Sequence, residues 1–122
     1  MVDEIMNQHS KIDVLINNAG VFKSRISQNQ DALDIRFAVN YFAPYLLTYG
    51  LMSLLKKGDS PRVINLSSAA QAAVSLDALE GKESLSAQEA YAQSKLALTM
   101  WSFYLAQEFD FLNKKVVIKY FC

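Results

Sequence analysis

The chain contains the stretch Ile12-Asp13-Val14-Leu15-Ile16-Asn17-Asn18-Ala19-Gly20, a short apolar run followed by two asparagines, an alanine and a glycine. An apolar run of this length is typical of a buried strand, and turn-forming residues directly after it indicate where the strand ends. We therefore expect a strand over residues 12–16 and a tight turn over residues 17–20. Because small residues let the backbone approach a ligand closely, this turn is also a candidate binding site.

Two more apolar runs predict two more strands, over residues 62–66 and 116–121. A long helix is expected between the first two strands, over residues 31–57. Its apolar pattern is closed by Gly58 and followed by Pro61, which are typical signals of a helix end.

A second long helix is expected to begin at Ser86 and to continue to about Leu112. Ser86 and Glu89 have the spacing of a capping box, which marks a helix start. Residues 69–85 have no clean apolar period and are rich in charge, so we expect a surface segment with one helical turn. Residues 1–10 have the pattern of an amphipathic helix.

The predicted order of elements is strand, long helix, strand, long helix, strand. Such an order is the signature of parallel βαβ units with right-handed crossovers, so the fold class is α/β. The length of 122 residues predicts a single domain. Ligands of such sheets bind beyond the carboxyl ends of the strands. We therefore expect Gly20, Ser68 and the end of the third strand to lie at one edge.

The composition limits the classes of partner and site. The chain has 12 basic and 12 acidic residues and no net charge, so it lacks the electrostatic signature of a nucleic-acid-binding protein. Its one cysteine, Cys122, allows no internal disulfide, and its one histidine, His9, leaves no cluster with metal-ligand spacing. We therefore predict no metal site. The composition and the acidic start of the chain favour a cytoplasmic location.

Residues 37–55 contain no charged residue and approach the length of a membrane-spanning helix. A helix that is apolar on most sides is also typical of a buried helix, so we predict that this one does not enter a membrane. Polar and helix-breaking residues interrupt the run: Asn40, Pro44, Thr48, Gly50 and Ser53.

The most informative motif for function is Tyr91-Ala92-Gln93-Ser94-Lys95. A tyrosine and a lysine four residues apart lie on the same face of a helix, so the ammonium can reach the surroundings of the phenol. The positive charge favours the phenolate, and the two side chains can therefore work as an acid–base pair. The spacing alone is weak, and its weight comes from its companions, Asn40 in an apolar helix and Ser68 at a strand end.

Four motifs in this order resemble the short-chain dehydrogenase/reductase family over nearly the whole chain. They are Asn17-Asn18-Ala19-Gly20, Val39-Asn40-Tyr41, Val63-Ile64-Asn65-Leu66-Ser67-Ser68 and Tyr91 to Lys95. The resemblance implies a Rossmann-like doubly wound fold and hydride transfer between NAD or NADP and a carbonyl or alcohol. The long spacer before Tyr91 is similar to that of retinol-dehydrogenase-like and WW-domain-oxidoreductase-like members. A lipophilic substrate follows by that analogy alone.

The resemblance also implies roles for the site residues. Tyr91 would be the general acid–base on the substrate oxygen, and Lys95 would assist its ionisation and hold the nicotinamide ribose. Ser68 would orient the substrate oxygen, and we expect it rather than Ser67 to be the catalytic serine. The backbone carbonyl of Asn40 would hold a water that relays protons to the lysine.

The resemblance implies cofactor contacts at the turn after the first strand, from Asn18, Ala19 and Gly20 together with Tyr91 and Lys95. Asn17 is expected instead to tie neighbouring strands together. The aromatic residues of the two long helices are expected in the core or at an interface rather than on a substrate. These are Tyr41, Tyr45, Trp101 and Tyr104.

Asn40 has a role that the chain itself helps to explain. Pro44 has no N–H, so the carbonyl of Asn40 loses its usual helical donor and becomes an available acceptor. The alternative is that Pro44 merely kinks a core helix. Both interpretations remain open at this point.

The chain departs from the family at its cofactor motif. The family's Gly-rich turn, which binds the pyrophosphate, is missing, and so is the Pro-Gly that usually follows the third strand. We therefore expect an incomplete Rossmann-like domain, truncated at both ends. Two functions follow. One is the catalytic half of an oxidoreductase that forms homo-oligomers through its long helices. The other is a catalytically silent module that pairs with a complete subunit through the same helices.

Overall fold

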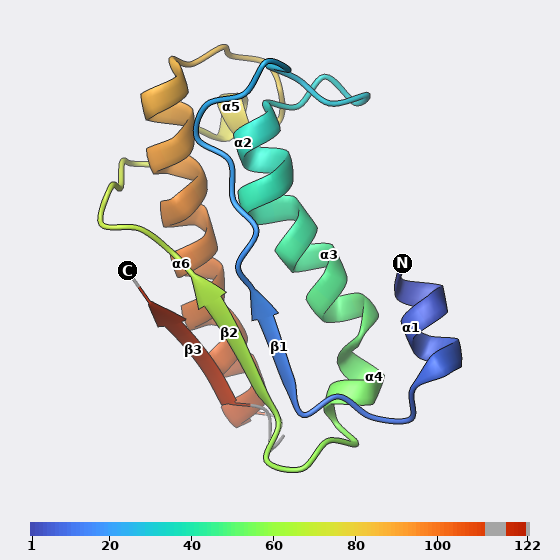
Figure 1. Ribbon diagram of the computed structural model, residues 1–122. Coiled ribbons are helices and arrows are strands. Elements are labelled where there is room, and N and C mark those ends of the chain that lie inside the picture. Colours follow the sequence, from blue (N-terminus) through green and yellow to red (C-terminus); the bar gives the residue numbers. More distant parts are fainter. Residues whose placement is uncertain (112–116, 122) are drawn as a thin grey trace.

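The computed structural model describes residues 1–111 and 117–121, and its strands form a single parallel sheet. The strands lie in the order β1 (Val14–Asn17), β2 (Arg62–Leu66) and β3 (Val117–Phe121). Because all of them run in the same direction, their carboxyl ends meet at one edge of the sheet, as Figure 1 shows. The predicted incomplete α/β fold with a three-stranded parallel sheet is confirmed.

The strand bounds differ slightly from the prediction. β1 begins two residues later than expected and extends through Asn17, which lies opposite Asn65 of β2 in the parallel register. The predicted helix end at Leu112, the first residue of the predicted third strand, Val116, and Cys122 lie outside the described residues.

The predicted continuous helix over residues 31–57 is wrong in its details, because residues 35–55 form several short segments. These are α2 (Ile35–Phe37), the π-helical turn η1 (Ala38–Phe42), α3 (Ala43–Gly50) and α4 (Met52–Leu55). The first helical residue is Ile35 rather than Asp31, because Asp34 caps the helix with its carboxylate, which accepts the N–H of Arg36 at 2.8 Å. The helix is interrupted at Leu51, whose backbone leaves the helical region with φ −100° and ψ 6°.

The other helices follow the prediction. The second long helix is α6 (Ala87–Phe111), and the hydroxyl of Ser86 accepts the N–H of Glu89 at 3.2 Å, which is the serine half of the expected capping box. The surface segment before it carries one short helix, α5 (Leu76–Leu79), and α1 (Val2–Gln8) lies near the amino terminus. No helix in the described ranges is long and apolar enough to cross a membrane.

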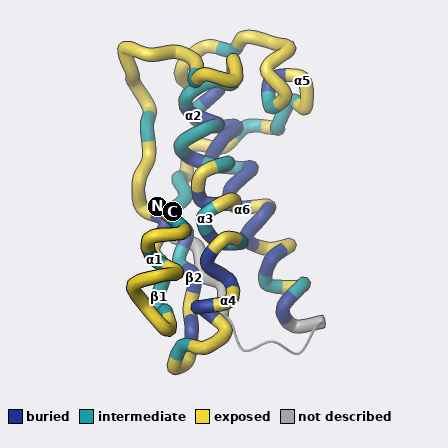
Figure 2. Tube along the Cα trace, turned by 90° about the vertical axis from the view of Figure 1, so that its right-hand side faces the viewer, coloured by how far each residue is buried: buried dark blue, intermediate teal, exposed yellow. Residues whose placement is uncertain are grey.

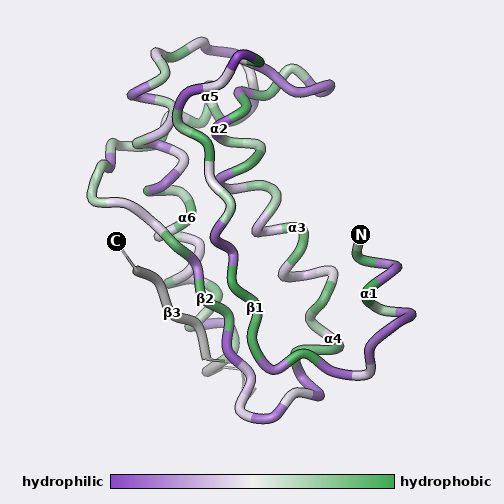
Figure 3. The backbone as a smooth tube through the Cα atoms, in the orientation of Figure 1, coloured by the Kyte–Doolittle hydropathy of each residue, from purple (hydrophilic) through white to green (hydrophobic). Residues whose placement is uncertain are grey.

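The helices and the sheet form two layers with the hydrophobic core between them (Figure 2). Leu55, Val63, Leu98 and Leu105 are at most 1% exposed, and burial of each such side chain contributes about 1.5–3 kcal/mol. Figure 3 shows β1 and β2 as largely apolar stretches, and from them Leu15 and Val63 pack in this core. Trp101 is buried in the same cluster, so its predicted place in the core is confirmed.

A row of polar side chains crosses this core. The amide of Asn17 in β1 donates to Asn65 Oδ1 in β2 at 2.7 Å and to Thr48 Oγ1 in α3 at 3.2 Å. The amide of Asn65 then donates to Ser102 Oγ in α6 at 2.8 Å. These bonds connect both strands to both helices, and they confirm that Asn17 ties neighbouring strands together.

The other face of the sheet has no helix over it in the part of the chain that the structure describes (Figure 1). Ile16 is 56% exposed on this face, and strand alternation and register place Val14, Ile64 and Leu66 there too. Parallel sheets are usually covered on both faces. The described chain therefore presents an accessible apolar surface on this side.

We expect Asn65→Leu to lower the free energy of unfolding by roughly 3 kcal/mol, because it leaves Ser102 without its donor and Asn17 without its best acceptor inside the core. The measurement is urea denaturation followed by circular dichroism. The control is Asn7→Leu at an exposed position of α1, which should change stability by about 0.5 kcal/mol or less. Equal effects of the two substitutions would show that the polar row does not support the fold.

Candidate active site

Lys95 is a buried cation at the carboxyl edge of the sheet. Its side chain comes from α6, is only 5% exposed, and donates from Nζ to the carbonyl of Leu66, the last residue of β2, at 2.9 Å. No carboxylate within the described ranges forms an ion pair with it. Burial disfavours the charged form and lowers the pKa of Lys95 from its ordinary value of 10.5. The ammonium therefore retains N–H donors that the described chain does not use.

Tyr91 lies one turn before Lys95 on the same helix, as the spacing predicts. The Nζ of Lys95 is 5.9 Å from the centroid of the Tyr91 ring, and Phe22 meets that ring edge-on with centroids 4.9 Å apart. The ring is half-buried. Its phenol oxygen forms no hydrogen bond with any described residue, so it is available to a substrate oxygen.

Gly20 lies directly against Lys95 and Asn40. A Cβ added at Gly20 would lie 3.3 Å from Lys95 Nζ and 3.4 Å from Asn40 Oδ1, which is closer than most real contacts. A side chain at residue 20 would therefore push on the ammonium and on the Asn40 amide, and glycine avoids this. The tertiary structure thus brings together Gly20, Asn40, Tyr91 and Lys95 from three separate parts of the chain.

The side chain of Asn40 is fully buried and clamps the turn after β1. Its Oδ1 accepts the N–H of Val21 at 2.8 Å, and its Nδ2 donates to the carbonyl of Val21 at 2.9 Å and to Ser94 Oγ at 3.0 Å. The sequence pointed to the backbone carbonyl of Asn40 and missed this side-chain role.

The backbone around Asn40 is widened into a π-helical turn, in which Ala43 donates to the carbonyl of Ala38 five residues back. The turn ends at Phe42, two residues before Pro44, which has no N–H for the carbonyl of Asn40. Turns of this kind are frequent at functional sites. The structure thus places an irregular helix beside Lys95. It does not decide whether Pro44 serves to free the carbonyl of Asn40 as an acceptor or only bends a core helix.

Ser68 follows β2 by two residues and is half-buried. Its hydroxyl accepts the N–H of Ala70 at 3.1 Å, and it forms no hydrogen bond with Tyr91 in the described chain. The hydroxyl of Ser67 donates instead to the carbonyl of Lys95 at 3.1 Å and lies 2.5 Å from Thr99 Oγ1. Ser67 is therefore occupied in joining β2 to α6, and the choice of Ser68 as the catalytic serine stays a prediction.

Asn18 and Ala19 are exposed at the end of β1. They line a hollow of about 400 Å³ between β1, α1 and α3, together with Ile16, Val39 and apolar neighbours. This position is open to a ligand. The described residues contain no cluster of three or more side chains that could hold a metal ion.

Sequence reasoning missed Val21 and Ser94, which connect the turn after β1 to α6. A usable signal was the position of Ser94 inside the tyrosine–lysine motif, where a small polar residue is fully buried. The partner of such a residue comes from a distant segment, so the motif alone could not identify Asn40 or Val21.

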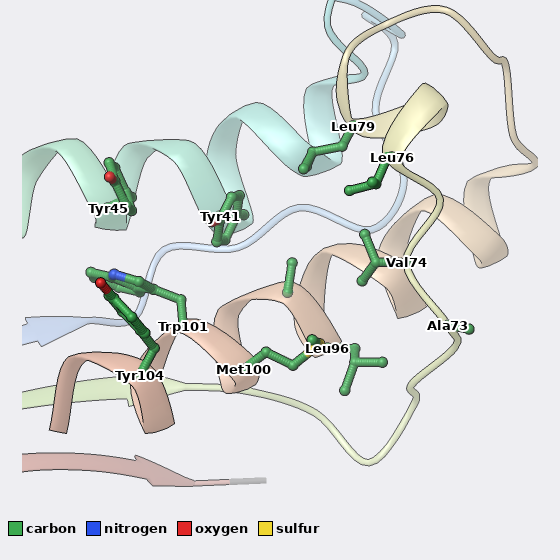
Figure 4. Close-up of a pocket in the computed structure, with 11 residues that line it drawn as sticks. Tyr41, Tyr45, Ala73, Val74, Leu76, Leu79, Leu96, Met100, Trp101 and Tyr104 are labelled. Atoms are coloured by element: carbon green, nitrogen blue, oxygen red, sulfur yellow. The ribbon is translucent and has the colours of Figure 1, made fainter. Parts of the chain in front are cut away.

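A second hollow, of about 660 Å³, lies away from the strand ends, between the two long helical paths and the segment around α5 (Figure 4). Its lining is almost entirely apolar, and includes Tyr41, Tyr45 and Leu76. Met100 and Tyr104 of α6 line it while remaining 57% and 62% exposed. This surface is distinct from the group around Lys95.

The sequence profile of the short chain dehydrogenase family matches residues 1–119. The chain is 37% identical over 103 residues to a polyprenol dehydrogenase of Danio rerio, a match that covers 80% of this chain and 32% of that protein. It is 31% identical over 115 residues to retinol dehydrogenase 14 of Homo sapiens, covering 93% and 34% respectively. The chain therefore spans about a third of the length of these relatives.

Solved structures share the fold. An uncharacterized protein from Mycobacterium paratuberculosis superimposes with a TM-score of 0.81 at 25% identity, over 98% of this chain and 45% of that one. A metagenomic short-chain oxidoreductase in complex with NADP gives a TM-score of 0.67 at 27% identity, over 98% and 49%. The resemblance to retinol-dehydrogenase-like members is confirmed, and the chain belongs to the short chain dehydrogenase family of oxidoreductases.

Proposed function

We propose that this chain provides the acid–base half of an NAD- or NADP-dependent oxidoreductase that acts on a carbonyl or alcohol. The observation that carries the proposal is the buried, unpaired ammonium of Lys95, which lies beside Gly20 and one turn from Tyr91. A buried charge without an anionic partner is unfavourable, and such strained ionisable groups gather at functional sites.

The residues around Lys95 fit a nicotinamide nucleotide. The ammonium has unused donors for ribose hydroxyls, and Gly20 leaves the space that a close backbone approach requires. Asn18 and Ala19 would contact the nucleotide from the same turn. The relative with NADP in its structure supports this assignment.

The bound nicotinamide would supply or accept the hydride, and the residues of this chain would handle the proton. Tyr91 would exchange that proton with the substrate oxygen, because its phenol has no other hydrogen-bond partner among the described residues. Lys95 would stabilise the negative charge on the phenol through the field of its ammonium. Ser68, at the end of β2, would donate to the same substrate oxygen.

The substrate is proposed to be a lipophilic alcohol or carbonyl. The relatives named for polyprenol and retinol support this class. This chain matches about a third of the length of those relatives, so the complete activity would also require residues that correspond to the rest of their length.

A second candidate function is pairing with another subunit through the long helices. The hollow in Figure 4 favours it, because exposed apolar side chains from α3, α5 and α6 gather there without a polar partner. Apolar surfaces of this kind mark association sites. The occupant would be a second copy of this chain or a complete subunit of the family.

Binding of NAD(H) and NADP(H) by calorimetry tests the first candidate. We expect saturable binding that Lys95→Ala weakens by roughly tenfold or more, because charge-assisted hydrogen bonds contribute about 1.5–3 kcal/mol. Tyr91→Phe should raise the Kd less than Lys95→Ala does, because it keeps the aromatic ring and the ammonium and removes only the phenol oxygen. Lys56→Ala, at an exposed position, is the matched control. A folded chain that binds neither nucleotide, or equal effects of the two lysine variants, contradicts the proposal.

Gly20→Ala tests whether the nucleotide approaches the turn after β1. The added methyl group would press on Lys95 and Asn40, so we expect the Kd for the nucleotide to rise at least about fivefold, equivalent to about 1 kcal/mol. Gly50→Ala is the control, because its Cβ would be similarly tight, 3.1 Å from Val2, and would contact neither Lys95 nor Asn40. If both variants bind as the unchanged chain does, Gly20 is not part of the nucleotide site.

Sedimentation analysis of Met100→Glu tests the second candidate. A charge placed in the apolar hollow should shift an oligomer to monomer, because a desolvated carboxylate opposes association. Gln88→Glu, at an exposed position in the first turn of α6, should leave the oligomeric state unchanged. A monomeric unchanged chain, or an oligomer that survives Met100→Glu, argues against pairing through this surface.

A further inference from the structure

A fully buried serine connects the turn after β1 with the first turns of α6. We propose that Ser94 is a positioning residue, which acts through Asn40 to hold the cofactor-binding turn in register with Tyr91 and Lys95. This inference rests on the proposed function, because it assigns Ser94 a part in preparing that site. The Ser94 hydroxyl hydrogen-bonds to Asn40 and to the Tyr91 carbonyl, and among the described residues it bonds neither the phenol of Tyr91 nor the ammonium of Lys95.

The connection is a continuous chain of short hydrogen bonds. Ser94 Oγ donates to the carbonyl of Tyr91 at 2.7 Å and accepts from Asn40 Nδ2 at 3.0 Å. Asn40 in turn holds both the N–H and the carbonyl of Val21, the residue after Gly20. Ser94 and Asn40 are both 0% exposed, so water does not compete for these bonds.

The orientation of the Asn40 amide is determined by its backbone partners. Val21 presents an N–H donor and a carbonyl acceptor, so Oδ1 must face the N–H and Nδ2 must face the carbonyl. Nδ2 then has one hydrogen left, and it points at Ser94 Oγ. Ser94 is therefore the one group that satisfies the last donor of Asn40 among the described residues.

These hydrogen bonds fix the positions of two segments relative to each other. In α6, the Tyr91 carbonyl that Ser94 binds is also the helical acceptor for the N–H of Lys95, so Ser94 acts on the turn that separates the two proposed site residues. In the turn after β1, Phe22 lies against the Tyr91 ring, with ring centroids 4.9 Å apart. Loss of the Ser94 hydroxyl would leave Asn40 with an unsatisfied donor and loosen Val21 relative to α6.

The chain contains a matched control on the same helix. Ser102 is 1% exposed, donates to the carbonyl of Leu98 at 2.8 Å and accepts from the amide of Asn65 at 2.8 Å. Ser94→Ala and Ser102→Ala therefore remove the same kind of hydroxyl from the same kind of partner. Only Ser94→Ala removes a hydrogen bond to Asn40, which holds the turn beside Lys95.

The test compares both alanine variants of the full chain by amide hydrogen exchange at Val21 and by the Kd for NAD(H) and NADP(H). After correction for global stability, we expect exchange at Val21 to be about tenfold faster in Ser94→Ala and unchanged in Ser102→Ala. Nucleotide binding should weaken at least about fivefold in Ser94→Ala alone. If Ser94→Ala does not fold, Ser94→Cys, which retains a side chain of similar size with a weaker acceptor, replaces it.

Equal exchange at Val21 in the two variants, or protection of Val21 that survives the loss of the Ser94 hydroxyl, would overturn the positioning role. This readout needs no nucleotide. A chain that binds no nucleotide would therefore refute the proposed function while the exchange data still decide the role of Ser94.

Discussion

The structure depends on hydrogen bonds that buried side chains make between α6 and the rest of the chain. Three hydroxyls of this helix are involved, and each has a different partner: Ser94 meets Asn40, Thr99 meets Ser67, and Ser102 meets Asn65. Each is buried, so the cost of leaving its partner unsatisfied is high. These directional bonds add to hydrophobic packing in fixing the register of α6 on the sheet.

That register determines what lies at the edge of the sheet. With α6 held by its hydroxyls, Lys95 reaches the last carbonyl of β2, and Tyr91 lies one turn further toward the edge. Burial of the ammonium removes water from it, which disfavours the charged form and lowers the pKa of Lys95. The N–H donors that the described chain does not use are free to bind acceptor oxygens of a ligand. The absence of a side chain at Gly20 leaves that ligand room to approach.

The same scaffold presents two surfaces of different character. At the carboxyl edge, polar and charged groups from three segments converge, as is usual for ligand sites of parallel α/β sheets. On the outer side of the helices, aromatic and aliphatic side chains surround a hollow of about 660 Å³ that contains almost no polar atoms. The first surface suits a polar nucleotide and the second suits another apolar surface. Membership of the short chain dehydrogenase family is consistent with both.

The sequence by itself determined the α/β class, the three strands, the capped start of α6, and the pairing of Tyr91 with Lys95, because these follow from local periodicity and spacing. It also indicated Gly20 and Ser68 as strand-end residues. Only the tertiary structure decided that the helix before β2 starts at Ile35 and is broken, that Lys95 bonds to Leu66, and that Asn40 acts through its side chain. The contacts of Lys95 and Asn40 depend on partners 19 to 54 residues away, and no local pattern encodes which distant group a buried donor will meet.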